Sequence, residues 1–422
     1  MSSKELSRYR VLGGVMEGQL ALHEAAAALG VSPRHARRLL KRLRESGAKG
    51  LVHGNRGRAP ANRTPEALRD QILAWVEGLY AGFNDSHLTE LRAEREQVLI
   101  GRETLRSILR AAGHRPKRRR RSKRHHRRRE RSASKGLMVL WDGSPHRWFG
   151  QDNPAVTLMA AVDDADGELL AAFFTPQETS AAYLRLLQAL VHKHGVPASI
   201  YQDRHSALRR NDDSWSLEEQ LAGRQHPTQV GQVLEDLAIQ PIFALSPQAK
   251  GRVERLFGVL QDRLLAEMRL DDITTPEAAN RYLEEGWIGR FNRRFRKTPR
   301  SQQAAYRSRR GLDLHKVIAF RYQATVLNDN TVRLGALTID IPPGPRGRSW
   351  AKARVDVRQH LDGSWSLYYQ DQTIAKAPAS ELAEPLRYRR GTSRKNRTKA
   401  AREEILVYLP NTTPPGTLSL GS

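Results

Sequence analysis

Three acidic residues occupy positions from which a protein could gather carboxylates for chemistry. Asp142 and Asp203 each end an expected strand, and Glu254 lies on a helix expected at 248–268. Three converging carboxylates repel one another unless a dication joins them, and oxygen-only ligands suit Mg²⁺ or Mn²⁺. Two such ions roughly 3.5–4 Å apart would activate a water or a 3′-hydroxyl for an in-line phosphoryl displacement. We therefore predict that these three acids are catalytic and bind two metal ions.

The helix expected at 248–268 can be checked against helical spacing. Ser246-Pro247 would begin it, and its buried face would consist of apolar residues about one turn apart, namely Val253, Leu256, Leu260 and Leu264. Lys250 and Glu254 lie one turn apart on an adjoining stripe, together with Gln261. A lysine on that stripe could hold a phosphate near the metal ions. The alternative is an exposed ion pair that stabilises the helix by about 0.2–0.5 kcal/mol, but the two strand-end aspartates favour the first interpretation.

The elements that must position these acids follow one order over residues 136–310. Three short apolar segments come first and predict antiparallel strands, the last two joined by an Asp-Gly turn: 137–141, 155–162 and 169–174. Helices and strands then alternate, at 178–194, 198–202, 227–238, 240–245 and 248–268. This is the order of an α/β ribonuclease-H-like core. The first and fourth strands are neighbours in such a sheet, so Asp142 and Asp203 would lie side by side.

Other polar residues near the expected strand ends are open to two interpretations. Asp163 and Asp164 could compete for the first catalytic position, but their Asp-Gly context favours a hairpin turn. His146 and Trp148 could contact a nucleotide or pack the connection between the first two strands. His205 could orient Asp203 or a phosphate.

The net charge indicates the kind of partner. The 422 residues include 71 Lys and Arg against 45 Asp and Glu, a formal net charge of +26. Such an excess implies a polyanion, most often nucleic acid. Cysteine is absent, which excludes disulfides, zinc–cysteine sites and thiol catalysis. No apolar run reaches the roughly 18 residues that span a bilayer, and the N-terminus lacks a secretory segment, so we expect a cytoplasmic, nucleoid-associated protein.

Residues 1–58 predict a helix-turn-helix that binds DNA. Gly30 breaks an Ala-rich helix, and Ser32-Pro33 begins the next with a serine N-cap and a proline at the first helical position. A turn between two such helices is typical of DNA-binding proteins. A two-helix hairpin with a solvated charged face is the alternative. The predicted DNA contacts are the polar residues early in the second helix: Arg34, His35, Arg37 and Arg38.

A second unit at 62–113 resembles another helix-turn-helix, with Arg102 and Arg106 as predicted DNA contacts. A basic linker follows at 114–135, in which thirteen positions are Lys or Arg and one is acidic. Such a block cannot fold alone, and along DNA it would release counterions. Its predicted contacts are Lys117, Arg118, Arg119, Arg120, Arg121, Lys123 and Arg124. On the catalytic helix, Lys250, Arg252 and Arg255 are predicted phosphate contacts.

The last part of the chain predicts a β domain. Short strand segments separated by Asn, Gly, Pro and Asp turns occupy 316–382 and suggest a small all-β barrel. Residues 383–422 form a basic C-terminal tail for which we predict no fold. The chain is therefore expected to be multidomain, with α-helical N-terminal units, an α/β core and a β domain.

Three sequence strings resemble the integrase-core transposases of bacterial insertion sequences, most closely the ISNCY family: WDGSPHRWFG at 141–150, IYQDRH at 200–205 and SPQAKGRVER at 246–255. The resemblance covers almost the whole chain and implies Asp142, Asp203 and Glu254 as the metal-binding triad. The second and third acids are farther apart than in the familiar integrase pattern. The polar, irregular stretch at 204–226 accounts for the excess as a loop inserted after the fourth strand.

The resemblance implies a function on DNA. It implies binding to double-stranded transposon ends, Mg²⁺- or Mn²⁺-dependent strand cleavage and transfer of 3′-hydroxyls into target DNA, by a homodimer or higher homo-oligomer on paired ends. One alternative is a transposase-derived DNA-binding regulator without catalysis. Another is a ribonuclease-H-like nuclease that cuts without joining, although long DNA-binding flanks on both sides of the core fit joining better.

Overall fold

The computed structural model describes residues 1–57, 63–117, 129–150, 152–210, 214–244, 251–335 and 337–379. Half of the basic linker (118–128), Lys250, the Ser246-Pro247 helix start and the C-terminal tail therefore lie outside the described residues. The chain divides into two compact units, Met1–Trp75 and Val76–Ser422. No helix among the described residues is long and apolar enough to cross a membrane.

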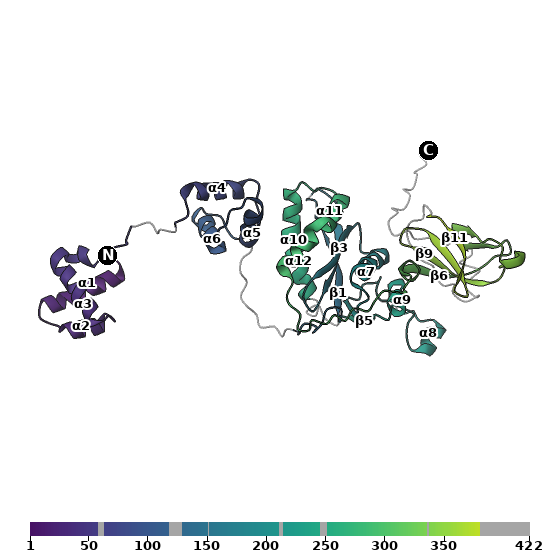
Figure 1. Cartoon of the computed structure of the whole chain (residues 1–422), viewed down its shortest axis with the longest axis horizontal. Coiled ribbons are helices and arrows are strands. Elements are labelled where there is room, and N and C mark those ends of the chain that lie inside the picture. The colour runs from purple at the N-terminus through teal and green to yellow at the C-terminus, as the bar shows by residue number, and fades with distance from the viewer. Residues whose placement is uncertain are drawn as a thin grey trace, which may run out of the picture. The chain divides into compact units, whose positions relative to one another are not determined.

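The first unit contains the helices predicted for residues 1–58 (Figure 1). They are α1 (Ser3–Met16), α2 (Leu22–Ala28), α3 (Pro33–Ser46) and a short 3₁₀ turn, η1 (Gly47–Leu51). The Ser32 hydroxyl accepts a hydrogen bond from the His35 amide at 3.3 Å and so caps α3. Gly47, at φ +59°, ends it. Leucines 12, 39, 40, 43 and 51 form the core of this unit. α4 (Glu66–Glu77) follows.

The second unit begins with α5 (Asp85–Arg95) and α6 (Arg102–Ala111). α6 lies in the unit expected at 62–113, and buries Leu105, Ile108 and Leu109. Polar side chains join α5 to the core helix α10 (Gly251–Leu270). His87 Nε2 lies 3.0 Å from Glu267 Oε1, with both side chains buried. Arg95 makes a two-point contact with Asp271 at 2.8 and 2.9 Å.

The core of the second unit is a mixed five-stranded sheet in the order β3-β2-β1-β4-β5. Its strands are β1 (Val139–His146), β2 (Val156–Asp163), β3 (Leu169–Thr175), β4 (Ser199–Gln202) and β5 (Gln240–Phe243). β1, β2 and β3 pair antiparallel, whereas β1, β4 and β5 pair parallel. This is the strand order predicted from the sequence.

Helices cover both faces of this sheet (Figure 1). On one face, α7 (Ser180–His194) and α9 (Gln229–Asp236) pack against β1 side chains that include Val139 and Trp141. On the other, α10, α11 (Pro276–Tyr282) and α12 (Ile288–Phe295) pack against Leu140 and Leu158. Successive strand residues point to opposite faces, so Asp142 lies on the face that α10 covers.

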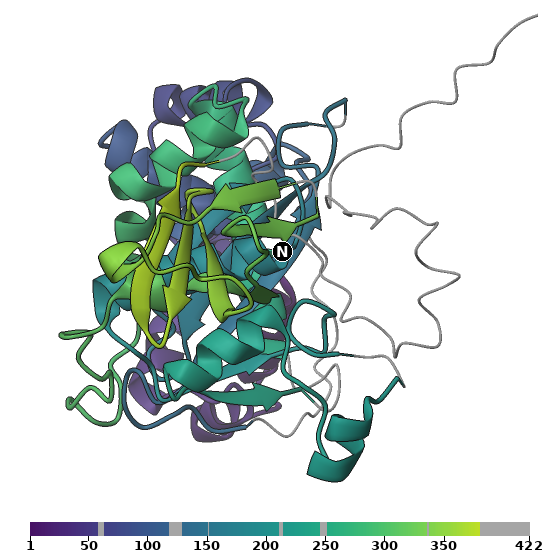
Figure 2. The same ribbon diagram turned by 90° about the vertical axis from the view of Figure 1, so that its right-hand side faces the viewer.

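The stretch at 204–226 is mostly irregular, as predicted for an insertion, and contains one short helix, α8 (Leu217–Ala222). Both views show α8 apart from the sheet and from the helices that cover it (Figures 1 and 2). The apolar side chains of Leu217 and Leu221 on this helix are exposed.

From α13 (Leu314–Val317) to residue 379 the described residues form strands and one short 3₁₀ turn, η4 (Pro345–Gly347). The strands are β6 (Ala319–Thr325), β7 (Thr331–Leu334), β8 (Leu337–Asp340), β9 (Arg354–His360), β10 (Trp365–Tyr369) and β11 (Gln372–Ala377). Over the described residues they pair as a four-stranded sheet, β11-β10-β9-β6, and a separate two-stranded one, β7-β8. The predicted closed barrel is therefore not supported, because barrel closure requires long-range pairing that strand propensity alone does not specify.

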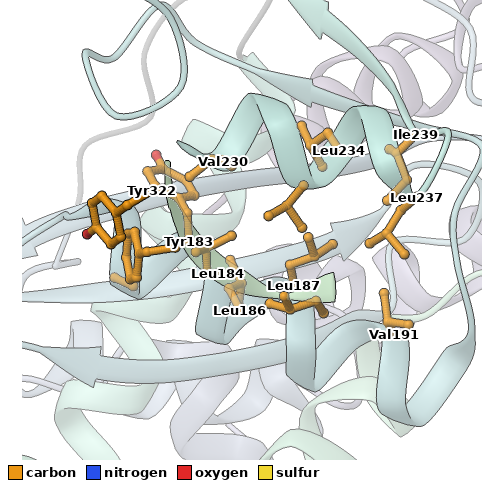
Figure 3. Packing of buried hydrophobic residues seen from close by; sticks show 14 of the residues in the cluster. Tyr183, Leu184, Leu186, Leu187, Val191, Val230, Leu234, Leu237, Ile239 and Tyr322 are labelled. Carbon is orange, nitrogen blue, oxygen red and sulfur yellow. The ribbon is translucent and has the colours of Figure 1, made fainter. Parts of the chain in front are cut away.

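The β domain shares a hydrophobic core with α7 and α9 (Figure 3). Tyr322 on β6 lies near Tyr183 and Val230 in this cluster. Gln229 reinforces the contact, since its side chain exchanges two hydrogen bonds of 2.8 Å with the backbone of Arg321.

Candidate active site

Asp142 and Asp203 lie where β1 and β4 part. Their parallel pairing ends at Leu140 and Tyr201. Asp203 directly follows β4, as predicted. Asp142 does not end its strand, because β1 continues pairing with β2 as far as His146. Asp142 therefore follows the end of the parallel β1–β4 pairing and does not mark the end of β1. Both half-buried aspartates still lie at one edge of the sheet.

Backbone amides orient the two aspartates. Asp142 Oδ1 accepts a hydrogen bond of 3.1 Å from the Gly143 amide. Asp203 Oδ1 accepts one of 2.8 Å from the His205 amide. His205 thus contacts Asp203 through its backbone, and its ring Nδ1 lies 3.3 Å from the Ala207 amide, which can donate to it.

A fully buried tyrosine lies close to both aspartates. Tyr183 on α7 donates its hydroxyl hydrogen bond to Glu178, in the loop between β3 and α7. Burial raises the pKa of Tyr183 well above its ordinary value, and the charges of Glu178, Asp142 and Asp203 raise it further. The phenol therefore stays protonated and acts as a donor. Three carboxylates are near enough to act electrostatically on this one side chain.

Glu254 lies in the first turn of α10 with its side chain exposed. Two contacts fix the course of this helix over the sheet. Arg252 pairs with Asp164 at the end of β2, and Gln261 Nε2 donates to Ser144 Oγ on β1 at 3.1 Å. Along α10, Glu254 lies between Arg252 and Gln261. It is about two turns before Gln261, so the side chains of Glu254 and Gln261 project from the same side of the helix. On the sheet, Asp142 lies between Ser144, which Gln261 contacts, and the end of β2 next to Asp164, which Arg252 contacts.

The donor chemistry of these residues fits a hard divalent cation. Asp142 and Asp203 supply carboxylate oxygens at one edge of the sheet, which is the ligand type that Mg²⁺ and Mn²⁺ prefer. In the part of the chain that the structure describes, no three Asp, Glu, His or Cys side chains are close enough to hold one ion. Convergence of all three predicted acids therefore stays a prediction.

The competing aspartates belong to the β2–β3 hairpin. Asp163 accepts hydrogen bonds from the Gly136 and Ala165 amides and the Tyr306 hydroxyl. Asp164 pairs with Arg129 at 2.7 Å as well as with Arg252. Burial acts to raise the pKa of Asp164, but hydrogen bonds from Arg129, Ser132 and Arg252 outweigh it and lower the pKa. Asp164 ties the hairpin to the linker and to α10, and Asp163 ties it to the start of the core and to Tyr306.

Trp148 takes the packing role and His146 remains exposed. Trp148 is buried, stands edge-on to Phe174 at a ring distance of 5.4 Å, and donates to the Ser144 carbonyl at 3.3 Å. The His146 ring contacts Trp148 at 5.5 Å.

The predicted DNA contacts have different surroundings. Arg34, Arg37 and Arg38 are exposed near the start of α3, with His35 half-buried. Other predicted contacts have acidic partners: Arg102 and Arg106 pair with Glu103 at 3.1 and 3.7 Å, and Lys117 with Asp262 at 2.7 Å. Arg255 is exposed. The predicted contacts outside the described residues are Arg118, Arg119, Arg120, Arg121, Lys123, Arg124 and Lys250. DNA contact by all of these residues stays a prediction.

Sequence reasoning missed two residues of this site. Glu178 precedes the Thr179 N-cap of α7. An acid there is explained by its favourable interaction with the helix dipole, so nothing in the sequence indicated a role at the site. Gln202 is buried and accepts a 3.0 Å hydrogen bond from Trp141 Nε1. The one signal in the sequence was a glutamine at the end of an otherwise apolar strand, because a buried glutamine needs a hydrogen-bond partner.

Comparisons with known proteins agree with this organisation. Residues 8–70 match the family model described as a winged helix-turn helix. The chain is 31% identical over 398 residues to the putative transposase y4bF of Sinorhizobium fredii, covering 90% of this chain and 84% of the relative. It is 30% identical over 333 residues to the transposase for insertion sequence IS1202 of Streptococcus pneumoniae, covering 69% of this chain and 68% of the relative.

Matches among solved structures are weaker. An intasome of simian T-cell lymphotropic virus is 16% identical and covers 74% of this chain and 96% of that one, with a TM-score of 0.30. The magnesium-bound catalytic core of HTLV-2 integrase is 16% identical and covers 35% of this chain and 83% of that one, with a TM-score of 0.25. TM-scores this low carry no weight in the assignment. The sequence relatives do, and by them the chain belongs to the insertion-sequence transposase family.

Proposed function

We propose that this protein cuts DNA at the ends of an insertion element and joins the freed 3′-hydroxyls to target DNA. The observation that carries the proposal is the position of Asp142 and Asp203, each just beyond the point where the pairing of β1 with β4 ends, in a sheet covered by the helix that bears Glu254. This arrangement supports a ribonuclease-H-like core of the DDE type. Family membership supports DNA transposition in general, and these residues support the chemistry.

Asp142, Asp203 and Glu254 would hold Mg²⁺ or Mn²⁺, two ions in the proposed centre. Bound there, the ions would supply Lewis-acid activation of the attacking oxygen and stabilisation of the leaving one. The Gly143 and His205 amides fix the aspartates before substrate arrives. The two contacts on α10 fix the helix that carries Glu254. Such preorganisation lowers the cost of assembling the site during the reaction.

The DNA-binding parts would hold the ends and the target in place. The exposed arginines of α3 would contact the element ends, and the linker at 114–135 would follow the phosphate backbone. The formal net charge of +26 over the chain suits simultaneous contact with two DNA segments. Action on paired ends would require at least a homodimer.

The test uses the purified full chain, labelled end DNA and Mg²⁺, with nicked and joined products resolved on denaturing gels. Asp142→Asn, Asp203→Asn and Glu254→Gln should each abolish joining and leave end binding intact. The matched control is Glu277→Gln, an exposed acid in the first turn of α11, which should keep full activity. Full joining by Glu254→Gln would refute the triad. Cutting without joining by the wild type would indicate a nuclease, and end binding with neither would indicate a regulator.

A further inference from the structure

Glu178 is not part of the predicted triad, but it acts together with Asp142 and Asp203 to raise the pKa of the buried Tyr183. Its side chain is 17% exposed, so most of its carboxylate is removed from water. The Tyr183 hydroxyl donates to its Oε1 atom, and the tyrosine itself is fully buried on α7. A buried donor of this kind holds the carboxylate in one place.

The other carboxylate oxygen lies against β1 immediately after Asp142. A Cβ atom added to Gly143 would stand 2.6 Å from Glu178 Oε2 and 3.0 Å from Thr157 Cγ2. Real Cβ atoms do not approach so closely, so the absence of a side chain at residue 143 makes room for this carboxylate. Glu178 is thus packed against the backbone that carries Asp142.

Glu178 also faces the turn that carries Asp203. His205 Nδ1 lies 3.8 Å from Glu178 Oε1, beyond hydrogen-bond distance. That nitrogen lies closer to the Ala207 amide, at 3.3 Å, which can donate to it. Among the ion pairs of the described residues, Glu178 has no Lys or Arg partner. His205 is its one basic ion-pair partner among the described residues, so no lysine or arginine there offsets the charge that Glu178 adds to those of Asp142 and Asp203.

We propose that Glu178 is a positioning residue of the active site, which draws a divalent cation to Asp142 and Asp203 without being its direct ligand. The inference rests on the proposed function, because it assumes a cation at the two aspartates. The Coulomb attraction of a third carboxylate held against β1 would strengthen cation binding, and partial burial weakens its screening by water. Tyr183 contributes by holding the carboxylate against β1.

The experiment measures Mn²⁺ binding to the full chain without DNA, from the electron paramagnetic resonance signal of the free ion. Glu178→Gln keeps the shape and removes the charge, and should raise the Mn²⁺ dissociation constant roughly tenfold. Tyr183→Phe should raise it less, and Glu178→Asp should restore part of the affinity. Glu235→Gln on α9, an exposed acid, is the control and should bind Mn²⁺ as the wild type does.

Joining is then followed as a function of Mn²⁺ concentration. Glu178→Gln should need roughly tenfold more Mn²⁺ for half-maximal rate and approach the wild-type rate at saturation. An unchanged Mn²⁺ affinity would refute the proposal, and so would a loss of binding as complete as in Asp142→Asn, which would make Glu178 a direct ligand. If Asp142→Asn itself binds Mn²⁺ normally, the proposed metal site fails, a result distinct from failure of Glu178 alone.

Discussion

Glu267 holds α5 to α10, and its removal should open this contact locally. Its carboxylate is buried and accepts hydrogen bonds from His87 Nε2 and Trp287 Nε1, both at 3.0 Å. A longer contact of 3.3 Å comes from Tyr282, which has a second partner in Asp271 at 3.0 Å. Glu267→Ala would therefore leave two buried donors, on His87 and Trp287, without an acceptor.

The magnitude follows from these two donors. An orphaned buried polar group costs about 1–3 kcal/mol, and the two side chains are only 1% and 2% exposed, so water does not reach them without movement. Release of the carboxylate from burial offsets part of this cost. We expect a loss of about 3 kcal/mol in the local opening free energy, which corresponds to about a hundredfold less protection.

Hydrogen exchange of the full chain, followed by mass spectrometry, measures this quantity segment by segment. Protection should fall in α5 and in the second half of α10, and remain at wild-type values in β2 and α7. Glu284→Ala, an exposed acid just before Trp287, is the control and should change protection little. If protection in α5 falls by less than about threefold, the reasoning is refuted. A fall in the sheet as large as that in α5 would also refute it, because the two donors that lose their acceptor lie only at the contact between α5 and α10.

Three further predictions concern pH, packing and charge. Burial acts to raise the pKa of Glu267, but the hydrogen bond and charge of His87 outweigh it and lower the pKa below its ordinary 4.5. Its stabilising contribution is then complete above about pH 4.5 and is lost as pH falls through the lower folded-state pKa; thermal unfolding should show this loss, and Glu267→Gln should lack it. Gly143→Ala should raise the Mn²⁺ concentration needed for half-maximal joining because its methyl group would displace Glu178, whereas Gly258→Ala on α10, where a Cβ meets nothing within 4 Å, should raise stability by about 1 kcal/mol in urea unfolding. Deleting residues 118–128 should flatten the dependence of log K on log salt for DNA binding, and an unchanged slope would show that this segment is only a tether.

The parts of the fold that follow from local signals were predictable. Ser32-Pro33 and Gly47 mark the ends of α3 because a cap and a glycine act within one turn. The three strands and the alternation that follows predict the order of the sheet, since connection lengths and apolar runs restrict the topology. On α10, Val253, Leu260 and Leu264 are buried as the helical period predicts.

The parts that depend on distant pairing were not predictable. The contact of His87 with Glu267 joins residues 180 positions apart, and no periodicity marks a polar pair of this kind. The same holds for Glu178, whose role appears only when β1 and α7 bring Gly143 and Tyr183 beside it. The strand end at Asp142 was misplaced because β1 has a second partner, β2, which extends it.

One helix connects the proposed chemistry with the preceding helical unit. α10 has Glu254 in its first turn, Gln261 against β1 in its middle, and Glu267 against α5 near its end. A helix of 20 residues is a rod of about 30 Å, and its hydrogen-bonded backbone resists bending between these contacts. A movement of α5 would therefore tilt α10 about its contact with Ser144 and move Glu254 relative to Asp142. The polar contacts between α5 and α10 thus give a physical route by which a movement of α5 would change the geometry of the carboxylates.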